Sequence, residues 1–172
     1  MTDLAVKRWQ RAELERAFAA YQETGRVANE TGDWNLWADL FTHDAVLNEH
    51  VYGIYCGREA IRGFIRKTMS TFPGSHMHAF PVIWHTIDDE RGMVICEIDN
   101  PMPDLGDGTC YSETNITILR YAGNGLWCGE EDVYNPLKFF SMLQKWCHAA
   151  VQSNQLPREA ESWRRTVTFN GT

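Results

Sequence analysis

The hydrophobic pattern of the chain changes its period near residue 76, and this change constrains the fold more than any other feature of the sequence. Before that point, apolar residues mostly recur every three or four positions, which is typical of helices with one buried face. After it, runs rich in β-branched and aromatic residues alternate with polar turns, as strands do. Helices that precede a series of strands indicate an α+β fold.

The pattern places the individual elements. Helices are expected at residues 11–32, 34–41 and 58–72, with a last helix beginning at Pro136. Gly32 is the expected end of the first helix, and Asp33 the expected N-cap of the second. Strands are expected at residues 45–50, 76–87, 93–100, 109–121 and 126–135, the last two joined by an Asn-Gly turn. The residues from Ser153 onward show no clear periodicity.

The composition excludes several classes of function. The 172 residues, of which 44% are hydrophobic, suit a single domain with a hydrophobic core. A net charge of −7 argues against nucleic acid or an anionic membrane as a partner. Five cysteines without CxxC spacing predict neither a disulfide framework nor a zinc site, and they are typical of a reduced, cytoplasmic protein. We see no secretory signal and no apolar run of membrane-spanning length.

Aromatic residues are more numerous than a core of this size needs, at 12% of the chain. Rigid aromatic walls favour a pocket for a small apolar molecule, and a bulky core is the alternative interpretation. A curved sheet covered by helices on its concave face would leave a cone-shaped hollow for such a molecule. Its walls would be Trp37, Tyr52, Tyr55 and Trp84, each of which could equally be core.

Two acids stand on expected strands. Glu49 and His50 end the first strand, and because neighbours in a strand point to opposite faces, only one of them would face the hollow. The sequence leaves open which one does. Asp132 precedes Tyr134 on the last strand and could act as a general base, since burial raises the pKa of a carboxyl toward neutrality. Alternatively, Asp132 is exposed or paired with an arginine such as Arg120.

Further polar residues could join the same site. His78 begins an expected strand, and a neutral imidazole both donates and accepts hydrogen bonds. His76 lies two residues earlier, but the pair lacks an obvious third ligand, so we predict no metal. The long strand alternates polar residues on one face, which is either solvated or lines a partly polar pocket: Tyr111, Glu113, Asn115 and Thr117.

Several short segments of the chain carry a family resemblance: Gly32-Asp33-Trp34, Leu40-Phe41 and Asp44-Ala45, with Gly57 and Ile61. In these segments the chain resembles the nuclear transport factor 2-like superfamily. Within it, the chain is similar to the SnoaL-like and ketosteroid-isomerase-like branch. The strand that starts at His78 and the closing Tyr134-Asn135-Pro136 also fit. The resemblance covers roughly residues 10–140 and implies a bent antiparallel sheet, of the cystatin-like type, with helices on its concave face. It implies one domain over residues 1–172 with a C-terminal helical extension near residues 136–155.

The resemblance also implies a function. Enzymes of this branch include polyketide cyclases, isomerases, dehydratases and epoxide hydrolases, often as homodimers, and most use no metal or organic cofactor. Glu49 falls near the proton-shuttling carboxylate of the ketosteroid isomerases. Asp132 falls where similar epoxide hydrolases carry the aspartate that activates water. His78 falls where SnoaL-like proteins carry an inward histidine.

The family's catalytic sets are nonetheless incomplete. The second acid of the steroid isomerases corresponds to Thr117, and Tyr21 lies too early to be its tyrosine partner. The Arg-x-Asp pair of the epoxide hydrolases and the first-helix aspartate of the dehydratases are missing. We therefore expect a SnoaL-like protein that binds a small apolar molecule and performs cofactor-free acid–base chemistry. The alternative is a non-catalytic binding or dimerisation module, and a protein-transport role is the weakest hypothesis.

Overall fold

The structure, a computed structural model, describes residues 9–166. The elements follow in the order α1 (Arg11–Thr31), α2 (Asn35–Ala38), β1 (Phe41–Glu49), β2 (Gly53–Cys56), α3 (Arg58–Met69), the 3-10 helix η1 (Gly74–His76), β3 (Val82–Asp88), β4 (Met93–Pro101), β5 (Ser112–Gly123), β6 (Leu126–Val133), α4 (Pro136–Gln152) and α5 (Arg158–Thr166). The α+β class predicted from the change of hydrophobic period is confirmed.

The strands form one six-stranded sheet in the order β2-β1-β6-β5-β4-β3. Neighbouring strands run antiparallel except β1 and β6, which are parallel, so the sheet is mixed. A parallel pair needs a long connection between its strands, and here the chain from β2 to β5 provides it. This pairing sets Glu49 beside Asp132.

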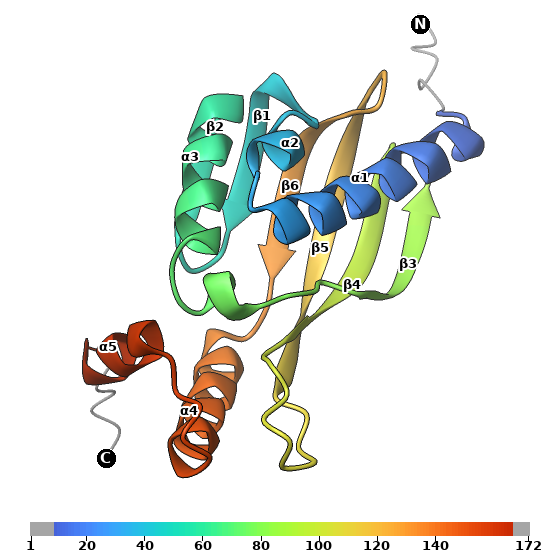
Figure 1. Ribbon diagram of the computed structural model, residues 1–172. Coiled ribbons are helices and arrows are strands. Elements are labelled where there is room, and N and C mark those ends of the chain that lie inside the picture. The colour runs from blue at the N-terminus through green and yellow to red at the C-terminus, as the bar shows by residue number, and fades with distance from the viewer. Residues whose placement is uncertain (1–8, 167–172) are drawn as a thin grey trace, which may run out of the picture.

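The sheet curves around the helices. Register shifts interrupt the β1–β6, β3–β4 and β5–β6 pairings, and such bulges bend a strand and increase its twist. Figure 1 shows α1, α2 and α3 together on one face of the sheet, which we call the inner face. The core between these layers contains Leu14, Phe18, Trp37, Leu47, Leu119 and Trp127 among its buried side chains.

Several local signals act as expected. Gly32 ends α1 with a φ of 75°, a left-handed conformation that glycine adopts at little cost. Asn124 and Gly125 both have positive φ in the β5–β6 turn, as Asn-Gly hairpin turns require. The side chain of Asn135 accepts hydrogen bonds from the first backbone amides of α4, with Pro136 in the first turn.

Several element boundaries differ from the prediction. The second helix ends at Ala38 because Phe41 already pairs with Trp127 of β6. The strand expected at residues 76–87 begins only at Val82, and His76 lies in η1 instead. Pro81 has no backbone N–H and so cannot donate to the ladder, and its carbonyl oxygen accepts from the amide of Asp99.

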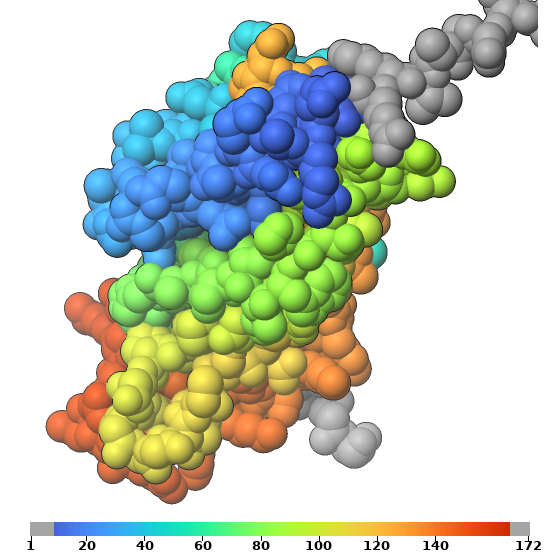
Figure 2. Space-filling model, turned by 90° about the vertical axis from the view of Figure 1, so that its right-hand side faces the viewer, coloured from blue at the N-terminus to red at the C-terminus, as the bar shows by residue number. Residues whose placement is uncertain are grey.

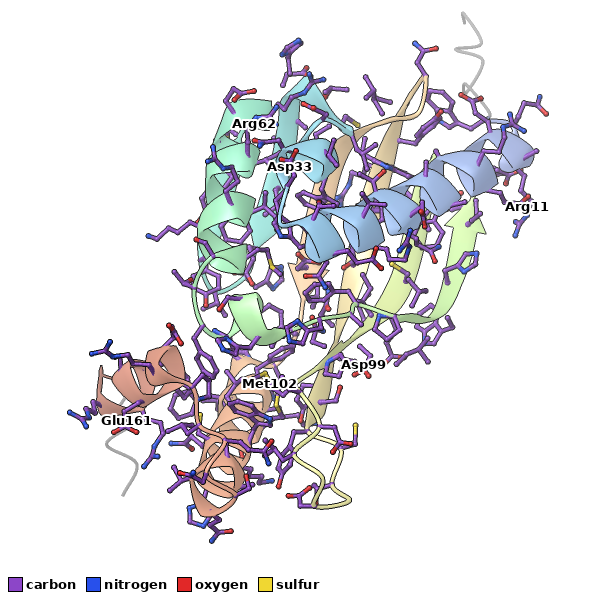
Figure 3. All side chains as sticks on the ribbon, in the orientation of Figure 1. Arg11, Asp33, Arg62, Asp99, Met102 and Glu161 are labelled. Carbon is purple, nitrogen blue, oxygen red and sulfur yellow. The ribbon has the colours of Figure 1, made fainter. Side chains whose placement is uncertain are left out.

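The C-terminal helices form a second apolar cluster at one end of the sheet. Met142, Leu143 and Trp146 of α4 pack with Phe72 and Met77 and with the loop between β4 and β5. Figure 2 shows that loop, in yellow, against the red and orange helices, and Figure 3 shows Met102 beside α4. Helix α5 was not predicted, because few of its residues are apolar; Ala160 and Trp163 join the cluster.

Candidate active site

A row of polar side chains crosses the inner face of the sheet. Its members come from four neighbouring strands: Asn100 of β4, Asn115 and Thr117 of β5, Asp132 of β6 and Glu49 of β1. The register places Thr117 and Glu49 directly beside Asp132 on either side. We call these five residues the polar row. Because partners in register share a face of the sheet, the row lies on the face that carries the core.

Asp132 is the acid of the row with an available oxygen. Its Oδ1 accepts a hydrogen bond from Oγ1 of Thr117 at 2.6 Å and another from Nδ2 of Asn115 at 3.1 Å. Within residues 9–166, no side chain or backbone amide donates to Oδ2. Burial raises the pKa of Asp132 to about 6, while the bond from Thr117 opposes the rise and the charge of Glu49 adds to it. A carboxylate with one fixed and one open oxygen, titrating near neutrality, can serve as a general base.

A hydrogen-bond network fixes the orientation of this acid. The amide Nδ2 of Asn100 donates to Oδ1 of Asn115 at 2.9 Å, and to the backbone carbonyl of Glu113 at 3.1 Å. The Nδ2 of Asn115 is thereby directed toward Thr117 and Asp132. Of the predicted polar face, Asn115 and Thr117 therefore do line the inner surface beside the candidate base.

The question of whether Glu49 or His50 points inward has a clear answer. Glu49 lies inside, only 6% exposed, and its Oε2 accepts from the backbone amides of Val51 and Tyr52 at 2.8 and 2.5 Å. The hydroxyl of Tyr134 donates to its Oε1. Glu49 is thus a fully bonded acid that closes the turn between β1 and β2. Burial of Tyr134 and its hydrogen bond to Glu49 raise the pKa of Tyr134.

His50 lies on the opposite side. Its Nε2 is 3.1 Å from Oε1 of Glu131, and the other carboxylate oxygen of Glu131, Oε2, pairs with Arg120 at 3.3 Å. Asp132 is therefore not the partner of Arg120, an alternative that the sequence left open. Because His50 is bonded on the outer face of the sheet, it does not share the inner surface with Asp132.

A tyrosine–glutamate pair lies deeper on the inner face, and sequence reasoning missed it. The hydroxyl of Tyr21 in α1 donates to Oε2 of Glu130 at 3.1 Å, and Glu130 is only 4% exposed. Burial raises the pKa of Glu130 well above its usual range, and the nearby charge of Asp132 raises it further. The first helix therefore supplies a tyrosine to an inward acid, but this acid is Glu130 and not the position of Thr117 to which the resemblance refers. The alternation of Glu130 and Asp132 was visible, but the position of α1 over β6 was not.

His78 is exposed in the segment between η1 and β3. It makes no hydrogen bond to Asp132 and lines a surface depression with residues of α3. The inward position that the resemblance implied is therefore not what the structure shows. His76 also lies off the sheet, with Nδ1 3.0 Å from the hydroxyl of Ser75. In the described part of the chain, no three His, Cys, Asp or Glu side chains gather to hold a metal ion.

The predicted aromatic walls are spread over different surroundings. Trp37 is core, and Tyr55 stacks on Phe64 with ring centroids 4.3 Å apart. Tyr52 is largely exposed at the edge of the same group. Trp84 lies on the outer face, where its Nε1 donates to Glu97 at 2.5 Å, so it cannot line a hollow on the inner face.

Two further aromatic side chains are near the second cluster. Tyr111 packs against it and donates to Asp107 at 2.8 Å. Tyr134 packs edge-on against Phe139 of α4 at 4.9 Å. Helix α4 therefore borders the end of the sheet where the polar row lies.

With this geometry in place, the family can be stated. A family model of the SnoaL-like domain matches residues 9–108, more than half of the chain. The chain belongs to this SnoaL-like family, as its sequence suggested. The match ends before β5, so Asn115, Thr117 and Asp132 lie beyond it. A search of curated proteins finds no match.

Solved structures support the same fold. A Bacillus subtilis protein provisionally assigned as an isomerase has a TM-score of 0.60 at 16% identity, over 77% of this chain and 94% of its own. An LEH-like epoxide hydrolase of M. tuberculosis has a TM-score of 0.60 at 14% identity, over 82% and 96%. A Jannaschia sp. CCS1 protein provisionally assigned as a SnoaL-like polyketide cyclase has 0.59 at 14%, over 76% and 91%. At such identities the likeness establishes the fold alone.

Proposed function

We propose that the protein binds a small, mostly apolar molecule against the inner face of the sheet and catalyses acid–base chemistry that needs no cofactor. The reaction would be of the isomerase, dehydratase, cyclase or hydratase type. The observation that supports this proposal is the state of Asp132: Oδ1 is held by Thr117 and Asn115, Oδ2 is open, and the pKa is near 6. Among the structural neighbours, one is named as an epoxide hydrolase and two are provisionally assigned as an isomerase and a cyclase.

The chemical step would begin at Oδ2 of Asp132. This oxygen takes a proton from a carbon next to a carbonyl group, and the electron pair of the broken C–H bond moves into the carbonyl to form an enolate. Isomerisation follows when the same carboxyl returns the proton to another carbon. Dehydration follows when the enolate expels a hydroxyl group, which leaves as water with the proton that Asp132 holds. In a hydratase, Oδ2 would take the proton of an attacking water instead.

Binding without catalysis is the second candidate, and a specific observation favours it. Glu49 is fully bonded to Tyr134 and two backbone amides, and Glu130 is held by Tyr21. Glu49 has donors to both of its oxygens, whereas Asp132 keeps one oxygen that accepts no hydrogen bond from the described residues. A single open carboxylate can bind a ligand's hydroxyl group as well as move a proton.

The first experiment identifies the ligand. Native mass spectrometry of freshly purified protein should release a bound apolar molecule, and 2-tetralone, an apolar ketone with acidic C–H bonds, is the probe if none is found. NMR then follows the exchange of its α-hydrogens for deuterium. The exchange rate with wild type should exceed the rate with Asp132→Asn by about 100-fold, the usual contribution of a general base. The wild-type rate should rise with pH through about 6, because the base must be ionised.

The matched control is Asp44→Asn, which removes one exposed carboxylate from the start of the sheet. It should keep the wild-type exchange rate. If Asp132→Asn also keeps that rate, Asp132 is not the base. If neither wild type nor Asp132→Asn accelerates exchange but the two bind the same ligand equally, the non-catalytic candidate holds and Asp132 has no part in binding.

We also propose that the protein is a cytoplasmic homodimer, assembled through the outer face of the sheet. Four apolar side chains are exposed on this face: Val46, Ile54, Trp84 and Val133. Ile54 is 65% exposed. An exposed apolar group of this kind is typical of an interaction surface. All five cysteines are free, which fits a reducing compartment. No helix within residues 9–166 is both long enough and apolar enough to cross a membrane.

A further inference from the structure

A surface depression of about 700 Å³ lies outside the polar row, between the C-terminal end of α1, helix α3 and η1. Its walls carry charge of one sign. Arg66 and Lys67 of α3 line it together with His78, the serines Ser70 and Ser75, and the amide of Asn29, and none of the described residues that line it is acidic. This is unusual on a chain whose net charge is −7.

The two cations are free to contact a ligand. Neither Arg66 nor Lys67 makes a side-chain hydrogen bond or an ion pair with any residue in the described range. Basic residues in the last turn of a helix often serve its unpaired carbonyl groups. Here the hydroxyls of Ser70 and Thr71 donate to the carbonyl of Lys67, each at 3.0 Å. The end of α3 therefore has other donors and does not occupy the two charged groups.

The acids next in sequence to the lining residues Asn29 and Gly32 already have partners. Glu30 pairs with Arg26 at 2.5 Å. Asp33 accepts from the backbone amide of Asn35 at 3.2 Å and from its side-chain amide at 2.7 Å. Within residues 9–166, no carboxylate forms an ion pair with Arg66 or Lys67.

The depression also has an apolar part. Trp34 and Met69 line it, and the indole of Trp34 packs edge-on against Phe80 at 6.3 Å, which fixes its position. No acceptor for the indole N–H is found among residues 9–166. A ligand there would meet two cations, an aromatic ring and a thioether.

We propose that this depression binds an organic anion with an apolar ring, such as an aromatic carboxylate. Arg66 and Lys67 would pair with the carboxylate, because charge-assisted hydrogen bonds from cations are the strongest that exposed side chains offer. The ring would lie against Trp34 and Met69. This site is independent of the chemistry proposed for Asp132 and nothing in that proposal requires it.

The test uses 2-naphthoate and its neutral analogue 2-naphthamide, with affinities measured by calorimetry at low ionic strength. Wild type should bind the carboxylate about tenfold more tightly than the amide, a preference typical of two partly exposed ion pairs. Arg66→Ala/Lys67→Ala should bind the two compounds equally. Lys138→Ala/Lys145→Ala, which removes the same charge from exposed positions on α4, should keep the wild-type preference.

Three results would overturn the proposal: no measurable binding of 2-naphthoate, no preference for it in wild type, or an unchanged preference in Arg66→Ala/Lys67→Ala. Circular dichroism checks that each variant is folded, and either single variant should show an intermediate preference. Asp132→Asn should bind 2-naphthoate as wild type does. The failure of this proposal and the failure of the proposed catalytic role are therefore distinguishable.

Discussion

The hydroxyl of Thr117 and the carboxylate of Asp132 face each other across two antiparallel strands, with Oγ1 and Oδ1 2.6 Å apart. This bond stabilises the ionised form of an acid whose burial favours the protonated form. The two effects oppose each other and leave Asp132 titrating near neutrality. The balance can be tested directly.

Thr117→Val should raise the pKa of Asp132, because it removes a hydroxyl donor while keeping the shape of the side chain. A hydrogen bond to a charged group contributes about 1.5 kcal/mol or more, which corresponds to a rise of about one unit. Carboxyl ¹³C NMR titration measures it. The control is Thr114→Val on the outer face of the same strand, where the hydroxyl donates to Glu97 at 2.8 Å. An unchanged pKa in Thr117→Val would contradict the assigned bond.

The stability of the protein should depend on pH through Asp132. Its folded pKa of about 6 lies above the unfolded value, so the folded state binds the proton more tightly. The resulting stabilisation is complete below about pH 4 and is lost as the pH rises through about 6. It is at most about 3 kcal/mol, since one pKa unit corresponds to about 1.4 kcal/mol.

Urea unfolding of wild type and Asp132→Asn at pH 4 and pH 7.5 checks this linkage. The free energy of unfolding of wild type, relative to that of the variant, should be lower at pH 7.5 than at pH 4. The charge of Asp132 raises the pKa of Glu130, so the variant also lowers that pKa, and this change acts in the same direction. A constant difference would mean that Asp132 has an ordinary pKa.

Tyr21→Phe should destabilise the protein, because it leaves the buried carboxyl of Glu130 without the donor 3.1 Å away. Loss of one partner of a buried polar pair costs about 1–3 kcal/mol. Tyr55→Phe removes a hydroxyl that bonds to a carbonyl at the surface and should cost less than about 0.5 kcal/mol. Equal melting temperatures for the two variants would show that the Tyr21–Glu130 bond contributes nothing.

Removing residues 137–172 should expose the second apolar cluster, including Phe72, Met77 and Leu105. We expect lower solubility, a lower midpoint of unfolding and stronger binding of a hydrophobic dye. Trp146→Ala is the milder test; Trp146 is 2% exposed and donates to the carbonyl of Pro103 at 2.9 Å, and its loss should cost about 3–5 kcal/mol. A truncated protein that stays soluble with unchanged stability and assembly would contradict the role given to α4.

Ile54→Glu should convert the proposed dimer to a monomer, because a charge within an apolar interface is left without a partner. Sedimentation equilibrium should then give a mass near 19.8 kDa instead of twice that value. Leu36→Glu changes an exposed apolar residue on α2 and should leave the mass of the dimer unchanged. A wild type that is already monomeric would rule out this assembly.

The sequence by itself determined the fold class and many of its turns and helix ends. The helical periods, the Asn124-Gly125 turn and the cap at Asn135 depend on neighbours in the chain, which is why they could be read locally. The polar character of the face that carries Asn115 and Thr117 was visible for the same reason. So was the presence of Asp132 on the last strand.

Only the tertiary structure decided which of these groups meet. The parallel pairing of β1 with β6 sets Glu49 beside Asp132, and the register of β5 brings Thr117 to the same carboxylate. Tyr21 reaches Glu130 across 109 positions of sequence. Such contacts depend on how whole elements pack, and no local pattern of residues encodes their distance, burial or pKa.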